Sequence, residues 1–233
     1  MKYKSLILFL SISISVHAQD MVSLSHYVFP DFQPGVVLLK NGTTNNAQLN
    51  YNAVTEEMVF DQNGEILAIG DAILYQIDTV FVSNEKFIRI NNKFVEIIID
   101  EPEIDLFVEH KCQLFPPGKP AAYGGTSQTS SSTSFSSLMS DGSVYKLKLP
   151  DDYKIIPYNV YWINRNGELK SFSSIKQLKR IYRDKKKVIN DYIKNNDVKL
   201  ENEKSIEDTI IYMEKISRTL LQRHRKQRFI KQE

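Results

Sequence analysis

A histidine and a cysteine two positions apart come closer to a catalytic pair than any other residues in this sequence. His110 and Cys112 lie in the segment from Leu106 to Leu114, which has the character of a β-strand, so both side chains are expected on one face. A thiol beside an imidazole is the minimum for a cysteine nucleophile. The same face carries Leu106 and Val108, whereas the opposite face carries the polar side chains Glu109, Lys111 and Gln113. An apolar row favours a buried, inert thiol, and a reactive His110–Cys112 pair is the alternative.

The sequence contains no recognisable metal-binding or cofactor motif. Three histidines follow residue 18, and none belongs to an HExxH motif or accompanies a CxxC motif. The segment from Asp61 to Glu65 imitates the start of a calcium loop, but Ala72 occupies the twelfth position, where such a loop needs glutamate. We therefore predict no catalytic, cofactor-binding or metal-ligating residues. A secreted hydrolase whose carboxylates meet only in the fold is the alternative.

The first eighteen residues have the pattern of a secretory signal peptide. Lys2 and Lys4 precede an apolar stretch from Leu6 to Val16, and Val16-His17-Ala18 forms a small-x-small cleavage site. The apolar stretch is too short to span a bilayer. We expect an exported protein that is periplasmic, outer-membrane-associated or secreted, with no transmembrane segment after cleavage.

A dense cluster of positive charge lies near the C-terminus. It comprises Arg223, Arg225, Lys226, Arg228 and Lys231. Anionic lipid headgroups, lipopolysaccharide or an acidic protein surface are the partners that such a cluster fits in an exported protein. Nucleic acid is not expected there. A solvated basic helix end, which the helix dipole stabilises, is the alternative explanation.

Charge is distributed unequally between the two parts of the chain. Residues 19–170 hold 11 Lys or Arg and 19 Asp or Glu, a net charge of −8, whereas residues 171–233 hold 17 and 9, a net charge of +8. Such an asymmetry indicates either two surfaces that attract each other or a basic element directed at an anionic partner. Cys112 is the single cysteine, so no intramolecular disulfide can form.

The stretch from Val36 to Phe172 has the pattern of an antiparallel sheet. Short runs of β-branched and aromatic residues recur along it, and turn residues separate them. Asn63-Gly64 and Asn166-Gly167 each lie between two such runs, and this dipeptide favours a two-residue hairpin turn. Eight to ten strands at this spacing predict a β meander folded as a sandwich or a small barrel.

Two further segments complete the expected organisation. Residues 115–143 contain a proline-rich stretch and a Ser/Thr-rich run, which predicts a flexible surface loop. From Ser174 the apolar period changes to about 3.6, which predicts an amphipathic helix that ends at Asn195-Asn196, and a second helix begins near Ser205. We thus expect an α+β protein with a signal peptide at 1–18, a β-rich domain at 19–172 and a helical hairpin with a basic tail at 173–233.

Several short motifs resemble a family of exported proteins of unknown function found in Bacteroidota. They are Val37–Gly42, Leu49–Asn52, Met58–Phe60, Ile77–Val80 and Phe94–Glu96. The resemblance implies an exported protein with a C-terminal helical segment and implies no catalytic residues. We therefore expect a non-catalytic cell-envelope protein, a binding or structural module for a protein, a glycan or an envelope surface. A secreted hydrolase, and adhesion to anionic surfaces through the basic C-terminal helix, are the alternatives.

Overall fold

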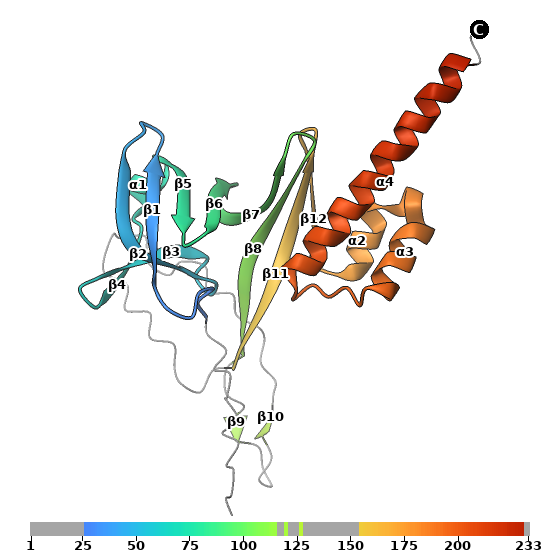
Figure 1. Ribbon diagram of the computed structural model, residues 1–233. Helices are drawn as coiled ribbons and strands as arrows, with labels where there is room; N and C mark the ends of the chain where they lie inside the picture. Colours follow the sequence, from blue (N-terminus) through green and yellow to red (C-terminus); the bar gives the residue numbers. More distant parts are fainter. Residues whose placement is uncertain (1–25, 116–118, 121–125, 128–153, 231–233) are drawn as a thin grey trace, which may run out of the picture.

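A ten-stranded antiparallel sheet followed by helices makes up the protein (Figure 1). The structure, a computed structural model, describes residues 26–115, 119–120, 126–127 and 154–230. The α+β class and the β meander predicted from the sequence are therefore confirmed. The signal peptide at 1–18 and most of the 115–143 segment lie outside the described residues. Within that segment, β9 (Lys119–Pro120) pairs with β10 (Thr126–Ser127).

Two meanders join side by side in the large sheet. Its strands are β1 (Gln33–Leu39), β2 (Thr44–Asn52), β3 (Glu57–Gln62), β4 (Glu65–Ala68), β5 (Ile77–Val82), β6 (Glu85–Ile90), β7 (Lys93–Glu101), β8 (Ile104–Phe115), β11 (Lys154–Arg165) and β12 (Glu168–Phe172). The spatial order is β12-β11-β8-β7-β6-β5-β1-β2-β3-β4. The short helix α1 (Asp71–Leu74) returns the chain from β4, so that β5 pairs with the free side of β1.

Positive-φ residues form the tight turns of this sheet. Asn63 and Gly64 have φ values of 57° and 85°, and Asn166 and Gly167 have values of 51° and 86°. These values confirm the two hairpin turns predicted from the sequence, since Asn and Gly tolerate this region. The turn between β6 and β7 has the same character, because Asn91-Asn92 has φ values of 52° and 65°. The sequence interpretation had not singled out that turn.

The β1–β7 part of the sheet curls around one apolar core. Strand β3 comes back to contact β7, and the Cys112 N–H of β8 donates to the Ala53 carbonyl just after β2, at 3.0 Å. The buried side chains inside this curl are Phe29, Val37, Leu49, Tyr51, Ala53, Met58, Ile77, Val80, Val82, Phe87 and Phe94. The expected sandwich or small barrel is thus one continuous sheet that curls on itself (Figure 1).

The helical region differs in detail from the expected pair of helices. It contains α2 (Ile175–Ile181), a 3₁₀ turn (Arg183–Lys185), α3 (Lys186–Asn195) and α4 (Glu203–Ile230). Tyr182 leaves the helical conformation, with φ −105° and ψ 34°, and its buried side chain donates a hydrogen bond to Glu214 at 2.9 Å. The expected first helix is therefore two helices with a turn between them. Helix α4 begins slightly earlier than expected, where the Asn202 side chain accepts from the Ser205 N–H at 3.0 Å.

These helices cover one face of β8, β11 and β12 and form a second core with it. The fully buried side chains of this core are Leu106, Val108, Tyr161, Ile163, Phe172, Leu178, Tyr182, Ile189, Ile206, Ile210 and Met213. Leu106 and Val108 belong to β8, whose next residues on the same face, His110 and Cys112, approach the first core. Strand β8 therefore contributes side chains to both cores.

Candidate functional site

His110 and Cys112 lie on one face of β8, as predicted, but each is engaged by different neighbours. The buried His110 ring lies 2.7 Å, Nε2 to Oε2, from Glu96, and its centroid lies 6.2 Å from that of Tyr51. Cys112 is half-buried and packs against the first core. Burial raises the pKa of the Cys112 thiol to about 11, so it stays protonated at neutral pH. This environment suits a packed side chain rather than a nucleophile.

Carboxylates surround the His110 imidazole. Glu203, at the start of α4, lies 3.8 Å from Nδ1 and accepts a hydrogen bond from Asn159 at 3.0 Å. Burial opposes protonation of His110, but the hydrogen bond to Glu96 and the charges of Glu96, Glu203 and Glu85 raise its pKa above the ordinary value. Burial and the charges of Glu96 and Glu203 raise the pKa of Glu85 to about 7, although the charge of His110 opposes this rise. The cluster therefore joins β8 to the helical region with titratable groups.

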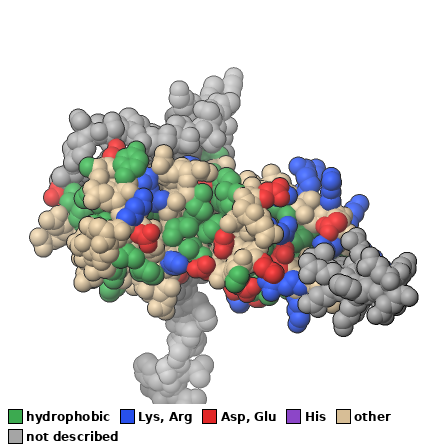
Figure 2. Space-filling model, turned by 90° about the horizontal axis from the view of Figure 1, so that it is seen from above, with side chains coloured by type: hydrophobic (Ala, Val, Ile, Leu, Met, Phe, Trp, Pro, Cys, Tyr) green, Lys and Arg blue, Asp and Glu red, His purple; other side chains and the backbone are tan. Residues whose placement is uncertain are grey.

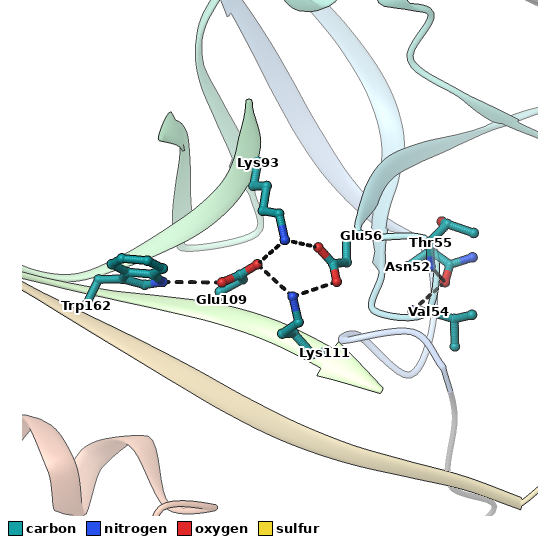
Figure 3. Close-up of polar contacts among 8 residues, drawn as sticks. All are labelled: Asn52, Val54, Thr55, Glu56, Lys93, Glu109, Lys111 and Trp162. Atoms are coloured by element: carbon teal, nitrogen blue, oxygen red, sulfur yellow. Dashed lines mark hydrogen bonds and ion pairs between the residues drawn. The ribbon is translucent and has the colours of Figure 1, made fainter. Parts of the chain in front are cut away.

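The opposite face of β8 carries a second polar network, which closes the curl of the sheet (Figure 3). The Glu109 carboxylate accepts from Lys93 and Lys111, each at 2.9 Å, and from the Trp162 indole N–H at 3.3 Å. Glu56, from the turn after β2, lies 2.7 Å from the Lys93 ammonium and 2.6 Å from that of Lys111. The network thus ties together the β2–β3 turn, β7, β8 and β11.

Hydrogen bonding and charge stabilise the ionised forms of Glu109 and Lys93 against the effect of their burial. Burial alone would raise the pKa of Glu109, but the hydrogen bonds and charges of Lys111 and Lys93 hold that pKa below its ordinary value. Burial opposes the Lys93 charge, yet its bonds to Glu56 and Glu109 raise the Lys93 pKa. Two cations and two carboxylates leave the network neutral, which suits a structural role.

The turn that supplies Glu56 is shaped by an asparagine at the end of β2. The Asn52 side-chain oxygen accepts from the N–H groups of Val54 and Thr55, at 3.0 and 3.2 Å (Figure 3). Glu56 itself has a φ of 59°, in the left-handed region. The hydrogen bonds of the Asn52 side chain therefore fix a turn from which the Glu56 carboxylate reaches β7 and β8.

A groove of about 590 Å³ lies between α1 and strands β5–β8, and we name it the α1 groove. Apolar side chains in it are Leu74, Ile77, Ile88, Ile97 and Phe107, and polar ones are Lys40, Tyr75, Asp78, Thr79, Lys86, Arg89, Asn91, Asn92, Asp100 and Asp105. Figure 2 likewise shows a strip of hydrophobic side chains with charged side chains beside it, between the curled sheet and the helices. Polar side chains outnumber apolar ones in this lining, so the groove offers a ligand many hydrogen-bonding groups beside a smaller apolar surface.

Two cations hold the α1 wall of this groove in place. Arg89 donates to the Leu74 carbonyl at 2.8 Å and to the Asn92 carbonyl at 3.2 Å, and Lys40 donates to the Tyr75 carbonyl at 2.9 Å. The Tyr75 side chain itself is 68% exposed, and the Arg89 guanidinium lies 5.6 Å from the centroid of its ring. The sequence interpretation missed this site, because its residues come from separate strands and neither Arg89 nor Tyr75 belongs to a recognisable motif.

The predicted C-terminal contact residues lie at the far end of α4. Helix α4 includes Arg223, Arg225, Lys226 and Arg228, but only its backbone is described there, and Lys231 lies outside the described residues. Within the described ranges, no three or more His, Cys, Asp or Glu side chains are grouped to hold a metal ion. No helix in the part of the chain that the structure describes is long and apolar enough to cross a membrane.

Comparisons of the chain with protein-family models, with curated proteins and with solved structures found no match.

Proposed function

We propose that the protein is a non-catalytic module of the cell envelope that binds a glycan in the α1 groove. The observation that carries this proposal is the exposed Tyr75 ring in a groove that is lined mainly by polar side chains and also holds apolar ones. An aromatic ring with a polar tip can contact the apolar face of a sugar while neighbouring polar groups bond its hydroxyls.

The charges of the groove favour a neutral ligand. Its cations, Lys40, Lys86 and Arg89, are matched in number by the carboxylates of Asp78, Asp100 and Asp105. Both Lys40 and Arg89 donate to backbone carbonyls of the α1 segment, and Lys86 pairs with Asp100 at 3.0 Å. Since these charges already have partners within the protein, a hydroxyl-rich, uncharged ligand fits better than a strongly ionic one.

Two further observations support the non-catalytic and envelope parts of the proposal. The Cys112 thiol has a raised pKa and packs against a core, and the His110 imidazole is buried against Glu96. Residues 1–18 have the sequence pattern of an export signal, which supports the envelope part of the proposal.

Calorimetric titration of the purified protein with a panel of uncharged oligosaccharides tests this proposal. The Tyr75→Ala variant should bind its best ligand at least about tenfold more weakly, or about 1.4 kcal/mol, because the stacking surface is lost. Phe81→Ala serves as the matched control, since Phe81 is also exposed but does not line the groove.

The outcomes separate the proposal from its rivals. Binding to no oligosaccharide, or equal binding by the wild type and Tyr75→Ala, would contradict a glycan site at the α1 groove. Release of new reducing ends during the titration would show hydrolysis and contradict the non-catalytic part.

A further inference from the structure

The surface of α2, the 3₁₀ turn and α3 is strongly basic. Residues 176–194 carry eight cations, which are Lys176, Lys179, Arg180, Arg183, Lys185, Lys186, Lys187 and Lys194. The same span holds two acids, Asp184 and Asp191. Among the described residues, Lys185 alone of these cations has a carboxylate partner, Asp184. Figure 2 shows Lys and Arg side chains around the outer side of the helical region.

A pocket of about 560 Å³ concentrates part of this charge between β12 and α2. Three cations line it, Lys170 from β12, Arg180 from α2 and Arg183 from the 3₁₀ turn. In the described parts of the chain, the guanidinium groups of Arg180 and Arg183 have no ion pair or side-chain hydrogen bond, and both residues are exposed. Two unpaired guanidinium groups therefore face the same space.

The other polar groups of the pocket leave donors rather than acceptors free. The Gln177 side-chain oxygen accepts from the Ser173 N–H at 2.7 Å, which leaves its NH₂ group available. Asp184, the carboxylate of the pocket, pairs with Lys185, whose charge offsets it. Lys170 pairs with the exposed Glu168 at 2.9 Å and is a weaker contributor.

We propose that this pocket binds the phosphate group of a phosphate monoester. Guanidinium groups bind oxyanions in bidentate fashion, which a pair of free arginines can do from two sides. The side chains that line the pocket have a net charge of +2, with three cations and one carboxylate, and a phosphate monoester carries about −1.5 to −2 at pH 7. The volume exceeds that of a single phosphate, so the rest of the ligand has room beside it.

The phosphate monoester can be a soluble phosphorylated sugar or a lipid headgroup, and one experiment distinguishes these two sources. The probes are glucose 6-phosphate in calorimetric titration and phosphatidic acid vesicles in co-sedimentation, with phosphatidylcholine vesicles as the neutral reference. Arg180→Ala/Arg183→Ala is the pocket variant. Lys186→Ala/Lys194→Ala removes the same charge from the same helical surface without touching the pocket.

The pocket variant should weaken phosphate binding at least about tenfold, whereas the control variant should leave it within about twofold. All four substituted side chains are exposed, so both variants should keep the urea unfolding midpoint of the wild type. If the pocket variant loses binding to glucose 6-phosphate alone, the ligand is a soluble phosphate ester. If it also loses binding to phosphatidic acid vesicles, the ligand is a lipid headgroup.

Two outcomes would overturn the proposal: no binding of either phosphate probe by the wild type, or equal losses in the two variants. Equal binding of phosphatidylcholine and phosphatidic acid vesicles, together with specific binding of glucose 6-phosphate, would assign the pocket to the soluble ligand. Equal losses would mean that a diffuse basic surface attracts anions and that the pocket adds nothing. The inference is independent of the α1 groove, so Tyr75→Ala should leave phosphate binding unchanged.

Discussion

Replacing Glu109 with glutamine should weaken the fold measurably, because this carboxylate lies at the centre of the network that closes the curled sheet. It accepts from Lys93, Lys111 and Trp162. The glutamine amide keeps the shape and one acceptor oxygen but removes the charge. Lys93 and Lys111 would then have Glu56 as their remaining carboxylate.

The magnitude follows from how far each pair is shielded from water. The Glu109 and Lys111 side chains are 5% and 17% exposed, and breaking a pair buried in this way costs about 3–5 kcal/mol. Lys93 is 47% exposed, so its contribution is screened. Because Glu56 still compensates both lysines, we expect a loss of about 2 kcal/mol in the free energy of unfolding.

Urea unfolding of the two proteins measures this loss. With a typical slope of about 2 kcal/mol/M, the midpoint should fall by about 1 M at an unchanged slope. Asp197→Asn is the matched acid-to-amide control, because the Asp197 and Lys199 side chains of its ion pair are 82% and 63% exposed, and this variant should leave the urea midpoint nearly unchanged. If Glu109→Gln costs no more than this control, the network does not hold the curl together.

Three further changes test other parts of the structure. The Gly35→Ala variant should lose about 2–3 kcal/mol of stability in the same urea assay, because a Cβ there would lie 2.6 Å from the Phe81 carbonyl oxygen, whereas Gly70→Ala, with open space around it, should be near neutral. A thiol-reactive chromogenic disulfide should label Cys112 about a hundredfold more slowly in the folded protein than in urea; equal rates would contradict its packed position. Since the folded pKa of Glu85 is about 7, against 4.5 unfolded, its contribution to stability is fully present below about pH 4.5 and is lost as pH rises to about 7. Over that pH window the unfolding free energy of the wild type should fall by about 1–2 kcal/mol relative to that of Glu85→Gln, after allowance for solvent screening of this half-buried group. If the unfolding free energies of the two proteins change with pH in parallel, the pKa of Glu85 is not raised in the folded protein.

Local signals in the sequence were sufficient for most of the architecture. In the Asn63-Gly64 and Asn166-Gly167 turns two consecutive residues take positive φ, and the Asn-Gly dipeptide alone predicts both turns. The break between α2 and α3 was not predictable in this way, because the apolar period continues through Tyr182. That residue leaves the helix where its side chain reaches Glu214 of α4, a contact that sequence periodicity does not contain.

The polar networks required knowledge of the fold itself. The alternation of β8 placed Glu109 on the face opposite Leu106 and Val108, and this geometry is correct. Its burial arises because the curl brings the β2–β3 turn against β7 and β8, so Glu56 meets Lys93 and Lys111 from far along the chain. The α1 groove is hidden in the sequence for the same reason, since the turn of the sheet brings its residues together.

The double role of β8 has a consequence for the order in which the chain can fold. Strands β1–β7 find their partners within a short length of sequence, but Leu106 and Val108 of β8 are covered by β11, β12 and the helices, which are synthesised much later. Long-range pairing of this kind slows folding and leaves apolar surface open in the meantime. A nascent chain that ends before β11 should therefore attract chaperones or aggregate through β8, although most strands of its sheet are already present.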